Sequence, residues 1–501
     1  MTFPKGHVLP VTRTAARTAA VLVILVSILL LTTGCATYSA KMKNLKPQLA
    51  NGEFDKALET VEDESGSKDR LLYYLERGLI LHYADRFAES NESFAAAERT
   101  ADELYTKSIS EGAFSLFSND NAISYRARPF EMAMVPYYKG LNYIYLGQRN
   151  EAQVEARRAS QLMSKYVDAT LDGLRDEDKG DFEKIRNNAF LLYYSGMLYD
   201  WDGELNDAFV AYRNAAVAYQ KNHSLLDIDI PPSLGRDLTR VAGRIGFRGE
   251  LDQLHKSCPD VFDFGEDDGG LPKTREDYEK AAAWRQGSGE IVLLLESGFV
   301  AQKSQIRFDI PIFEGEAYND PGYWSWQIWA GMGNMQALVK GRKVEYWASV
   351  AAPELDDSHP GPVAGARVTA GLAGDHTVTT RVENCTRQAR ITFDAEKPSI
   401  FFKTILRGLT KYLATRGAEK AGGSWAGLAA NIFGAVTESA DTRSWLTLPE
   451  HVNLARISLP PGTYDLQVEL LGLRGEVLST QIIPAVEVTA GDWTFISRRV
   501  F

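Results

Sequence analysis

The sequence predicts an α+β protein in which an N-terminal array of stacked helices, an α-solenoid, precedes a β-sandwich-like C-terminal half with an inserted helical block. Three observations support this prediction. Aromatic pairs and glycines recur before residue 225, short strand-like segments separated by glycine and proline follow residue 288, and 501 residues are too many for one core. We expect four segments: a leader (1–34), a helical array (36–225), a helical linker (226–287) and a β-rich domain (288–501) whose helical insertion spans 399–440.

The N-terminal segment has the composition of a secretory leader. Lys5, Arg13 and Arg17 precede an apolar run, 19–31, that ends in small residues and Cys35. The run has 13 residues, whereas a membrane-spanning helix needs about 20. We therefore favour a cleaved leader, and an uncleaved membrane anchor is the alternative.

The segment Leu31-Thr-Thr-Gly-Cys35 resembles a bacterial lipobox, in which the cysteine is acylated and becomes the new N-terminus. It departs from the usual pattern at Thr32, where the family has leucine. No aspartate follows Cys35, which by the sorting rule of Gram-negative lipoproteins implies the outer membrane. The resemblance implies a protein held by a lipid on Cys35 at the periplasmic face of the outer membrane.

Charge and cysteine content limit the partners and the chemistry. The net charge is −11, and removal of the three basic residues of the leader makes it −14. Nucleic-acid binding needs clustered lysine and arginine, so we expect no nucleic-acid partner.

After Cys35 the only cysteines are Cys258 and Cys385. In an oxidising compartment they could form a disulfide, and the alternative is two separately buried thiols.

A repeated pattern runs through the helical half. Paired tyrosines precede Gly78, Gly140 and Gly196, with a turn residue 7 positions after each glycine, a small residue 12 positions after it and an alanine 19 positions after it. The pattern resembles the tetratricopeptide repeat (TPR), although insertions at 104–134 and 166–184 interrupt it. Such arrays form a groove that binds peptides. The alternative is a helical spacer without a ligand.

The first insertion contains the candidate binding residues. Polar residues break the helical pattern before Pro129 restarts a helix. Polar loops beside a scaffold are common ligand sites, and guanidinium groups bind carboxylates through paired hydrogen bonds. We predict a partner-binding site formed by Asn119, Asp120, Tyr125, Arg126, Arg128, Arg157 and Arg158. The alternative is that these arginines bridge neighbouring helices.

The C-terminal half alternates strand-like segments with turns. The expected strands are 290–296, 304–312, 344–350, 377–383, 389–393, 452–459, 463–471, 477–483 and 493–499. In the helical block, one apolar face includes Phe401 and Ile405, and Lys403, Arg407 and Lys411 form a basic face. We expect this helix to cover a sheet, and binding to an anionic membrane surface is the alternative.

The sequence contains none of the common catalytic motifs, such as His-Glu-x-x-His or Gly-x-Ser-x-Gly. We therefore expect no enzymatic activity, no cofactor and no metal. Dispersed carboxylates can nevertheless form a glycosidase pair.

Four aromatic residues either pack in a core or stack on a sugar: Tyr323, Trp324, Trp326 and Trp329.

Together these features resemble a poorly characterised family of bacterial envelope lipoproteins with a lipobox, a TPR-like half and a β-rich half. The resemblance covers nearly the whole chain after Cys35 and rests on segments 118–121 with Tyr125, 139–147 with 154–158, 289–293 and 440–449. In the last segment we expect a structural clamp, with Asp441 paired to Arg443 and Trp445 in the core, rather than a binding site. Relatives are encoded near small lipoproteins that activate penicillin-binding proteins, which implies a role in cell-wall assembly.

The sequence therefore predicts a non-enzymatic, lipid-anchored scaffold that binds an envelope protein or peptide, including other lipoproteins, during envelope or peptidoglycan assembly. The alternative is a periplasmic protein that binds or cleaves glycan with its C-terminal domain.

Overall fold

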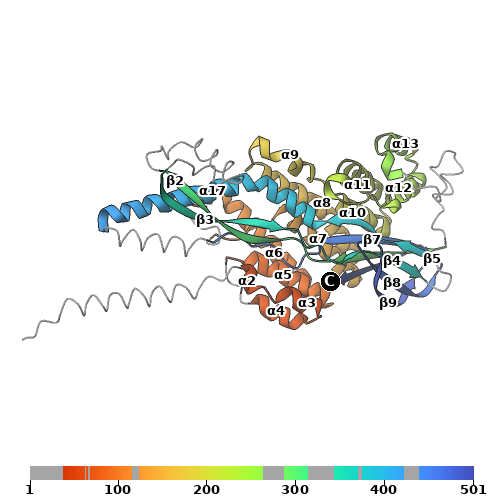
Figure 1. Cartoon of the computed structure of the whole chain (residues 1–501). Helices are drawn as coiled ribbons and strands as arrows, with labels where there is room; N and C mark the ends of the chain where they lie inside the picture. The colour runs from red at the N-terminus through yellow and green to blue at the C-terminus, as the bar shows by residue number, and fades with distance from the viewer. Residues whose placement is uncertain are drawn as a thin grey trace, which may run out of the picture.

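The structure of the chain, a computed structural model, describes residues 38–62, 64–65, 68–115, 123–262, 287–313, 343–370, 375–422 and 439–501. Helices fill the N-terminal half and strands dominate the C-terminal half, which confirms the predicted mixed composition (Figure 1). The helices are α2 (Tyr38–Lys41), α3 (Leu45–Ala50), α4 (Phe54–Glu62), α5 (Arg70–Tyr83), α6 (Phe87–Ser115), α7 (Pro129–Tyr145), α8 (Arg149–Leu171), α9 (Asp176–Lys184), α10 (Ala189–Asp202), α11 (Leu205–Leu226), α12 (Pro232–Ile245), α13 (Arg248–Ser257), the 3-10 helix η2 (Pro259–Phe262) and α17 (Cys385–Gly422).

The repeated glycines allow close packing of consecutive helices. A β-carbon at Gly78 in α5 would lie 2.7 Å from the ring of Phe94 in α6, and one at Gly196 in α10 would overlap the ring of Tyr212 in α11. The helices α5 and α6, α7 and α8, and α10 and α11 pack as pairs. The residues between the paired helices turn the chain with positive φ: Asp85 at 57°, Gly147 at 69° and Gly203 at 86°. Glycine adopts this conformation without steric cost, which accounts for two of the three positions.

Ten strands form two four-stranded sheets and a two-stranded ribbon in the described residues. The central sheet has the order β10-β1-β7-β6 and the outer sheet the order β5-β4-β8-β9. Strand β1 pairs in parallel with β10, and the other pairs are antiparallel. The strands are β1 (Gly289–Ser297), β2 (Gln302–Phe313), β3 (Val344–Asp356), β4 (Val363–Ala370), β5 (Asp375–Val378), β6 (Thr380–Asn384), β7 (His451–Leu459), β8 (Gly462–Gly472), β9 (Val477–Val488) and β10 (Trp493–Val500).

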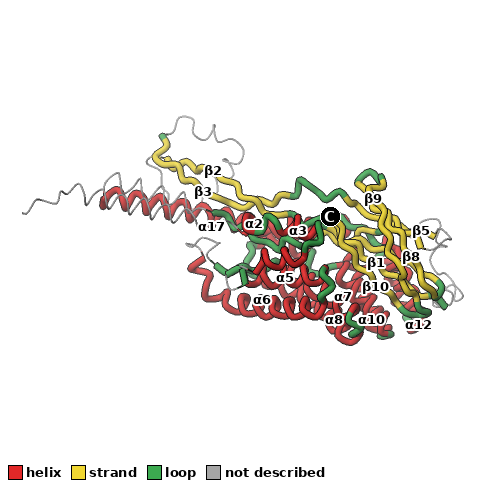
Figure 2. The backbone as a smooth tube through the Cα atoms, turned by 90° about the horizontal axis from the view of Figure 1, so that it is seen from below, coloured by secondary structure: helices red, strands yellow, loops and turns green. Residues whose placement is uncertain are grey.

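The central sheet lies between the helices and the outer sheet (Figure 2). Side chains alternate across a strand. In β1, Ile291 and Leu293 pack against the outer sheet, whereas Val292 and Leu294 belong to the hydrophobic core shared with the helices. The helical and β-rich halves are therefore joined through a continuous buried core.

An arm formed by β2, β3 and α17 projects from these layers (Figures 1 and 2). Ile405 and Tyr412 of α17 pack against Ala348 and Val350 of β3, so the apolar face of this helix covers the ribbon. Phe402 is 53% exposed and Arg407 is buried. The predicted division into an apolar and a basic face is therefore only partly correct, because an aromatic residue beside Phe401 is exposed and one of the predicted basic residues is buried.

Some strand predictions are wrong. Residues 389–393 were expected to form a strand but lie within α17, so their alternating pattern did not determine their conformation. The expected strand 377–383 is divided between β5 and β6, which belong to different sheets. Strand β4 was not expected, because Gly365 and Ala366 are weak strand formers.

The described chain begins against the β-rich half. Tyr38 of α2 is buried, and the Ser39 hydroxyl donates a hydrogen bond to the carbonyl of Thr442 at 3.1 Å. Helix α2 is thus fixed to the segment that precedes β7.

Several predictions fall outside the described residues: the leader with Cys35, Asn119 and Asp120, the aromatic residues Tyr323, Trp324, Trp326 and Trp329, and the end of the helical block. The described part of 226–287 contains α12, α13 and η2. Within the described ranges, no helix combines the length and the apolar character needed to cross a bilayer.

Candidate functional site

Three tyrosines of the helical array reach a buried carboxylate of the central sheet. Glu296 of β1 is fully buried, and its carboxylate accepts hydrogen bonds from Tyr137 (2.8 Å) and Tyr138 (3.3 Å) of α7. Tyr83 of α5 donates a third bond at 2.5 Å. A buried carboxylate is costly unless hydrogen bonds replace its water. The phenols therefore hold the sheet against the helices, and this face of the array is closed to a partner.

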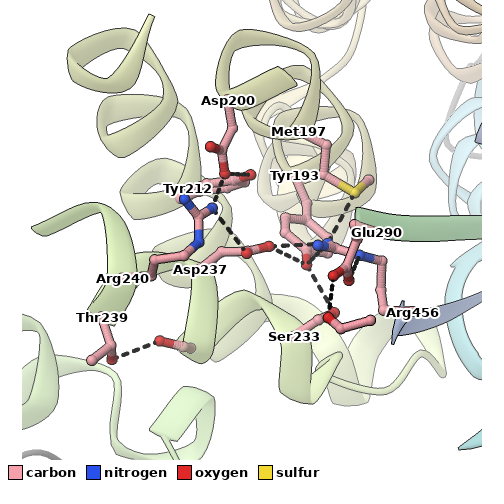
Figure 3. Close-up of polar contacts among 12 residues, drawn as sticks. Tyr193, Met197, Asp200, Tyr212, Ser233, Asp237, Thr239, Arg240, Glu290 and Arg456 are labelled. Carbon is pink, nitrogen blue, oxygen red and sulfur yellow. Dashed lines mark hydrogen bonds and ion pairs between the residues drawn. The ribbon is translucent and has the colours of Figure 1, made fainter. Parts of the chain in front are cut away.

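A second polar cluster joins α10 and α12 to β7 (Figure 3). The Arg456 guanidinium donates to the Asp237 carboxylate at 3.0 Å and to Glu290 at 2.8 Å. It also contacts the hydroxyl of Tyr193 at 3.0 Å, and Asp237 accepts from Arg240 at 3.2 Å. Burial alone would lower the pKa of Arg456, but Asp237 and Glu290 raise it well above its usual value. Because these charges have partners inside the cluster, its role is to fix helices to sheet.

The predicted clamp in segment 440–449 is confirmed. The Arg443 guanidinium binds Asp441 at 2.8 Å, and Trp445 is fully buried. Two helices extend the clamp: Glu131 of α7 accepts from the Trp445 amide at 2.8 Å, and Glu76 of α5 accepts from the Leu446 amide at 2.7 Å. The segment is therefore a joint between the two halves.

The insertion residues that the structure describes are also structural. Tyr125 was expected in a binding loop but is only 2% exposed, and its hydroxyl donates to Glu131 at 2.6 Å. Arg128 forms an ion pair with Glu396 of α17 at 3.0 Å, and Arg126 is half-buried. Tyr125 therefore does not lie on an exposed loop, because the β-rich half covers this part of the insertion, and its contact with a partner stays a prediction.

The arginines of α8 behave differently from each other. Arg158 pairs with Glu98 of α6 at 2.7 Å and with Glu155 at 3.1 Å, so it bridges helices. Arg157 is exposed, with its guanidinium 5.9 Å from the ring centre of Tyr199. The structure does not bring Arg157 and Arg158 together with the insertion in a described cleft.

Cys258 and Cys385 are free and buried, so the alternative of two separate thiols holds. Burial first, and then the carboxylates of Glu383 and Glu296, raise the pKa of the Cys385 thiol well above its usual value. This cysteine is therefore held as a neutral thiol.

A cleft of about 820 Å³, which we call the junction cleft, opens where the helices meet the edges of both sheets. Strand β9 is the last strand of the outer sheet and β10 the last strand of the central sheet. The lining residues are Leu49, Ala50, Gly52, Phe54, His82, Tyr83, Asp85, Phe87, Tyr145, Leu470, Ser479, Gln481, residues 483–487 and residues 494–501. Sequence reasoning missed this cleft, because its walls come from segments far apart in the chain.

The inner side of the junction cleft is rigidly hydrogen-bonded. The Ser497 amide donates to the Tyr145 hydroxyl at 2.7 Å, and His82 Nδ1 lies 2.6 Å from the Asn142 side-chain oxygen. Burial lowers the pKa of His82, and burial also raises the pKa of Tyr83 well above its usual value. Both shifts favour the neutral forms of these side chains.

Arg498 and Arg499 line one end of the junction cleft, and Lys46 lies beside Arg499 but outside the lining. Arg499 donates to the Thr447 carbonyl at 3.2 Å and lies 5.1 Å from the ring centres of Phe299 and Phe501. Lys46 Nζ lies 4.7 Å from the same Phe299 ring, and burial lowers its pKa to about 8. The neighbouring Arg498 is exposed.

A second cleft of about 1090 Å³ lies among α8, α10, α11 and the end of α9. Three of its lining basic residues form ion pairs: Lys165 with Asp102 at 2.6 Å, Lys184 with Asp181 at 2.5 Å, and Arg186 with Asp168. It is a polar surface on which most of the basic side chains already have an acidic partner.

The chain matches no family model, no curated protein and no solved structure.

Proposed function

We propose that the protein is a non-enzymatic scaffold, held by a lipid on Cys35 at the periplasmic face of the outer membrane, that binds a partner protein during envelope or peptidoglycan assembly. The observation that carries the proposal is the junction cleft, where two sheet edges and the ends of several helices surround an open space. Sheet edges bind extended protein segments through backbone hydrogen bonds. We place the binding site in this cleft, away from the buried Tyr125 side chain.

The fold supports a scaffold role. The helix pairs with glycines at their contacts fit a TPR-like solenoid, and the two facing sheets fit a β-sandwich. In this solenoid the face formed by α5 and α7 is filled by the chain's own sheet through Glu296. A partner is then bound at the junction of the two halves, where the array stops covering the sheet.

The glycan-binding alternative depends on Tyr323 and Trp324 and their neighbours, which lie outside the described residues. The described residues give no observation that favours it. Sedimentation of the full chain with purified peptidoglycan checks it directly, and retention comparable to that of a known peptidoglycan-binding protein would favour this alternative over the scaffold.

Photo-cross-linking in cells tests the scaffold. A benzoylphenylalanine at Gln481, in the junction cleft, is expected to cross-link one envelope protein reproducibly. The same probe at Val210, which is 42% exposed on α11, serves as the control. A second probe at Ser479, which also lines the cleft, repeats the test. Identical adducts from Gln481 and Val210, or no protein adduct from either Gln481 or Ser479, would show that the cleft is not the binding site.

A further inference from the structure

The root of the arm, where β2 leaves the body, and the first described helix are attached to the same short segment before β7. The Ser39 hydroxyl of α2 donates to the Thr442 carbonyl at 3.1 Å. On the arm, Lys303 Nζ of β2 donates to the neighbouring carbonyl, that of Arg443, at 3.3 Å. Cys35 precedes Ser39 by 4 residues. A lipid on Cys35 would therefore leave the chain close to the root of the arm.

The arm extends from this root past α2 and away from the layers of the body (Figures 1 and 2). The ribbon reaches from Lys303 to Phe313, which is 10 residues or about 34 Å along a strand. Trp347 lies opposite Pro311, 8 residues or about 27 Å from Lys303. The arm therefore projects from the part of the body that would carry the lipid, and Trp347 lies in its far half.

The arm exposes aromatic side chains on more than one face. Trp347 of β3 is 46% exposed and Phe402 of α17 is 53% exposed. Ala348 packs against α17, and side chains alternate along a strand, so Trp347 points to the opposite face of the ribbon. Phe402 follows Phe401, whose ring stacks on that of Phe308 in β2. A surface that docks on one protein usually presents a single apolar face, whereas these two rings lie on different faces of the arm.

The sequence that follows the far end of the arm is also apolar. Residues 321–339, between β2 and β3, and residues 423–437, after α17, contain no charged residue and include four tryptophans. Tryptophan is enriched where membrane proteins meet the boundary between lipid and water. These two stretches lie outside the described residues, and their composition agrees with the exposed rings of the described arm.

Charge does not select the partner of the arm. The exposed charged residues of the ribbon include both signs: Arg307, Asp309, Lys343 and Glu345. Attraction to an anionic surface would therefore be opposed by repulsion from the carboxylates. Burial of apolar surface has to provide the binding, and this does not require anionic lipid.

We propose that the far half of the arm, with Trp347 and Phe402, inserts into the headgroup region of the bilayer that holds the lipid on Cys35. The inference rests on the lipid anchor proposed above and adds a second membrane contact. A bilayer suits the two rings because it surrounds an inserted element, whereas a protein groove covers one face. A lipid alone lets the body rotate about its attachment, so the second contact would fix the orientation of the body on the membrane.

Fluorescence quenching in vesicles tests the inference. The full lipidated chain with Trp347→Cys or Phe402→Cys is labelled with nitrobenzoxadiazole and reconstituted into phosphatidylcholine vesicles. Cys258 and Cys385 are buried and should not react with the label. We expect nitroxide-labelled lipid to quench both arm positions several times more strongly than Val210→Cys, a control that is 42% exposed on α11.

Flotation separates the arm from the anchor. The mature chain from residue 36, which contains every described residue, is exported without lipid and centrifuged with phosphatidylcholine vesicles through a density gradient. We expect Trp347→Ser with Phe402→Ser to lower the partition into vesicles about tenfold or more, since two apolar side chains no longer leave water. Val154→Ser with Val210→Ser, which also removes two exposed apolar side chains, is the matched control and should not change it.

Several outcomes overturn the membrane contact. These are equal quenching at Val210 and the arm positions, no quenching at Trp347 and Phe402, no flotation of the unlipidated chain, or flotation that the double arm variant does not change. Labels shielded by a co-purified envelope protein, without quenching by lipid, would assign the arm to a protein partner instead.

The anchor and the arm can fail separately. If Cys35→Ala keeps its palmitate label but the unlipidated chain floats through Trp347 and Phe402, the anchor is wrong and the arm contact stands. If the lipid on Cys35 is confirmed but lipid does not quench the arm labels, only this inference fails.

Discussion

Arg443, just before β7, forms an ion pair with Asp69, just before α5, at 2.7 Å across a separation of 374 residues. Both side chains are almost completely buried. Arg443 also holds Asp441, so its removal would leave two carboxylates without their cation.

Arg443→Ala should therefore destabilise the protein strongly. Removing one partner of a buried ion pair costs about 3 to 5 kcal/mol, because the remaining charge stays buried. The free energy of unfolding from urea titration measures the effect. Arg474→Ala, at an exposed position, should change it by less than about 0.5 kcal/mol. Similar small changes in both variants would show that the joint does not hold the halves together.

The helix contacts predict a contrast between two glycines. Gly196→Ala should cost about 1 to 3 kcal/mol, because the new methyl group would overlap the Tyr212 ring. Gly249→Ala in α13 meets open space and should be neutral or stabilising by up to about 1 kcal/mol. Thermal melts of the two variants decide the matter, and equal melting temperatures would contradict the close packing of α10 on α11.

The buried Glu76 predicts a pH dependence. Burial raises its pKa from 4.5 to about 7, against the opposing hydrogen bonds from Thr447 and Leu446. Between pH 4.5 and pH 7 the folded protein therefore binds more protons than the unfolded chain. The contribution of Glu76 to the free energy of unfolding falls as the pH rises through this range. The full loss is up to about 3 kcal/mol.

Urea titrations at pH 5 and pH 8 measure this dependence. Glu76→Gln should reduce the loss of stability between the two pH values, because the amide does not ionise. The same pH dependence in wild type and Glu76→Gln would show that another group is responsible.

Lipid attachment predicts a labelling difference. Cells given a clickable palmitate analogue should label the wild-type protein, and Cys35→Ala should lose the label because the acylated thiol is gone. Cys258→Ala, which alters a buried thiol, is the control and should keep it. Equal labelling of wild type and Cys35→Ala would exclude the lipobox.

Contacts that are local in sequence could be predicted. Gly78 and Phe94 are close in the chain, so the spacing of small residues predicted that α5 and α6 pack closely. The clamp of Asp441 and Arg443 is likewise a contact between near neighbours. In such cases the residue pattern and the contact it produces lie within one helix pair or one turn.

Contacts between the two halves could not be predicted. Nothing in the tyrosine pattern of α7 indicates that Tyr137 binds Glu296, 159 residues later. Tyr125 has the polar neighbours of an exposed loop, yet Glu131 and the Arg443 guanidinium surround its phenol. The junction cleft was missed for the same reason, since β9, β10 and the ends of α5 and α7 meet only in the folded chain.

The hydrogen bond between Ser39 and Thr442 limits how far a lipid anchor would let the protein move. Cys35 precedes Tyr38, the first residue of α2, by 3 residues, which extend over at most about 11 Å. A lipid on Cys35 would therefore act as a short tether. It would keep the folded protein at the bilayer surface and would prevent it from moving away into the periplasm. A partner would then have to come to within reach of the membrane, and lengthening the tether between Cys35 and Tyr38 with a flexible insert should extend the distance over which the scaffold can act.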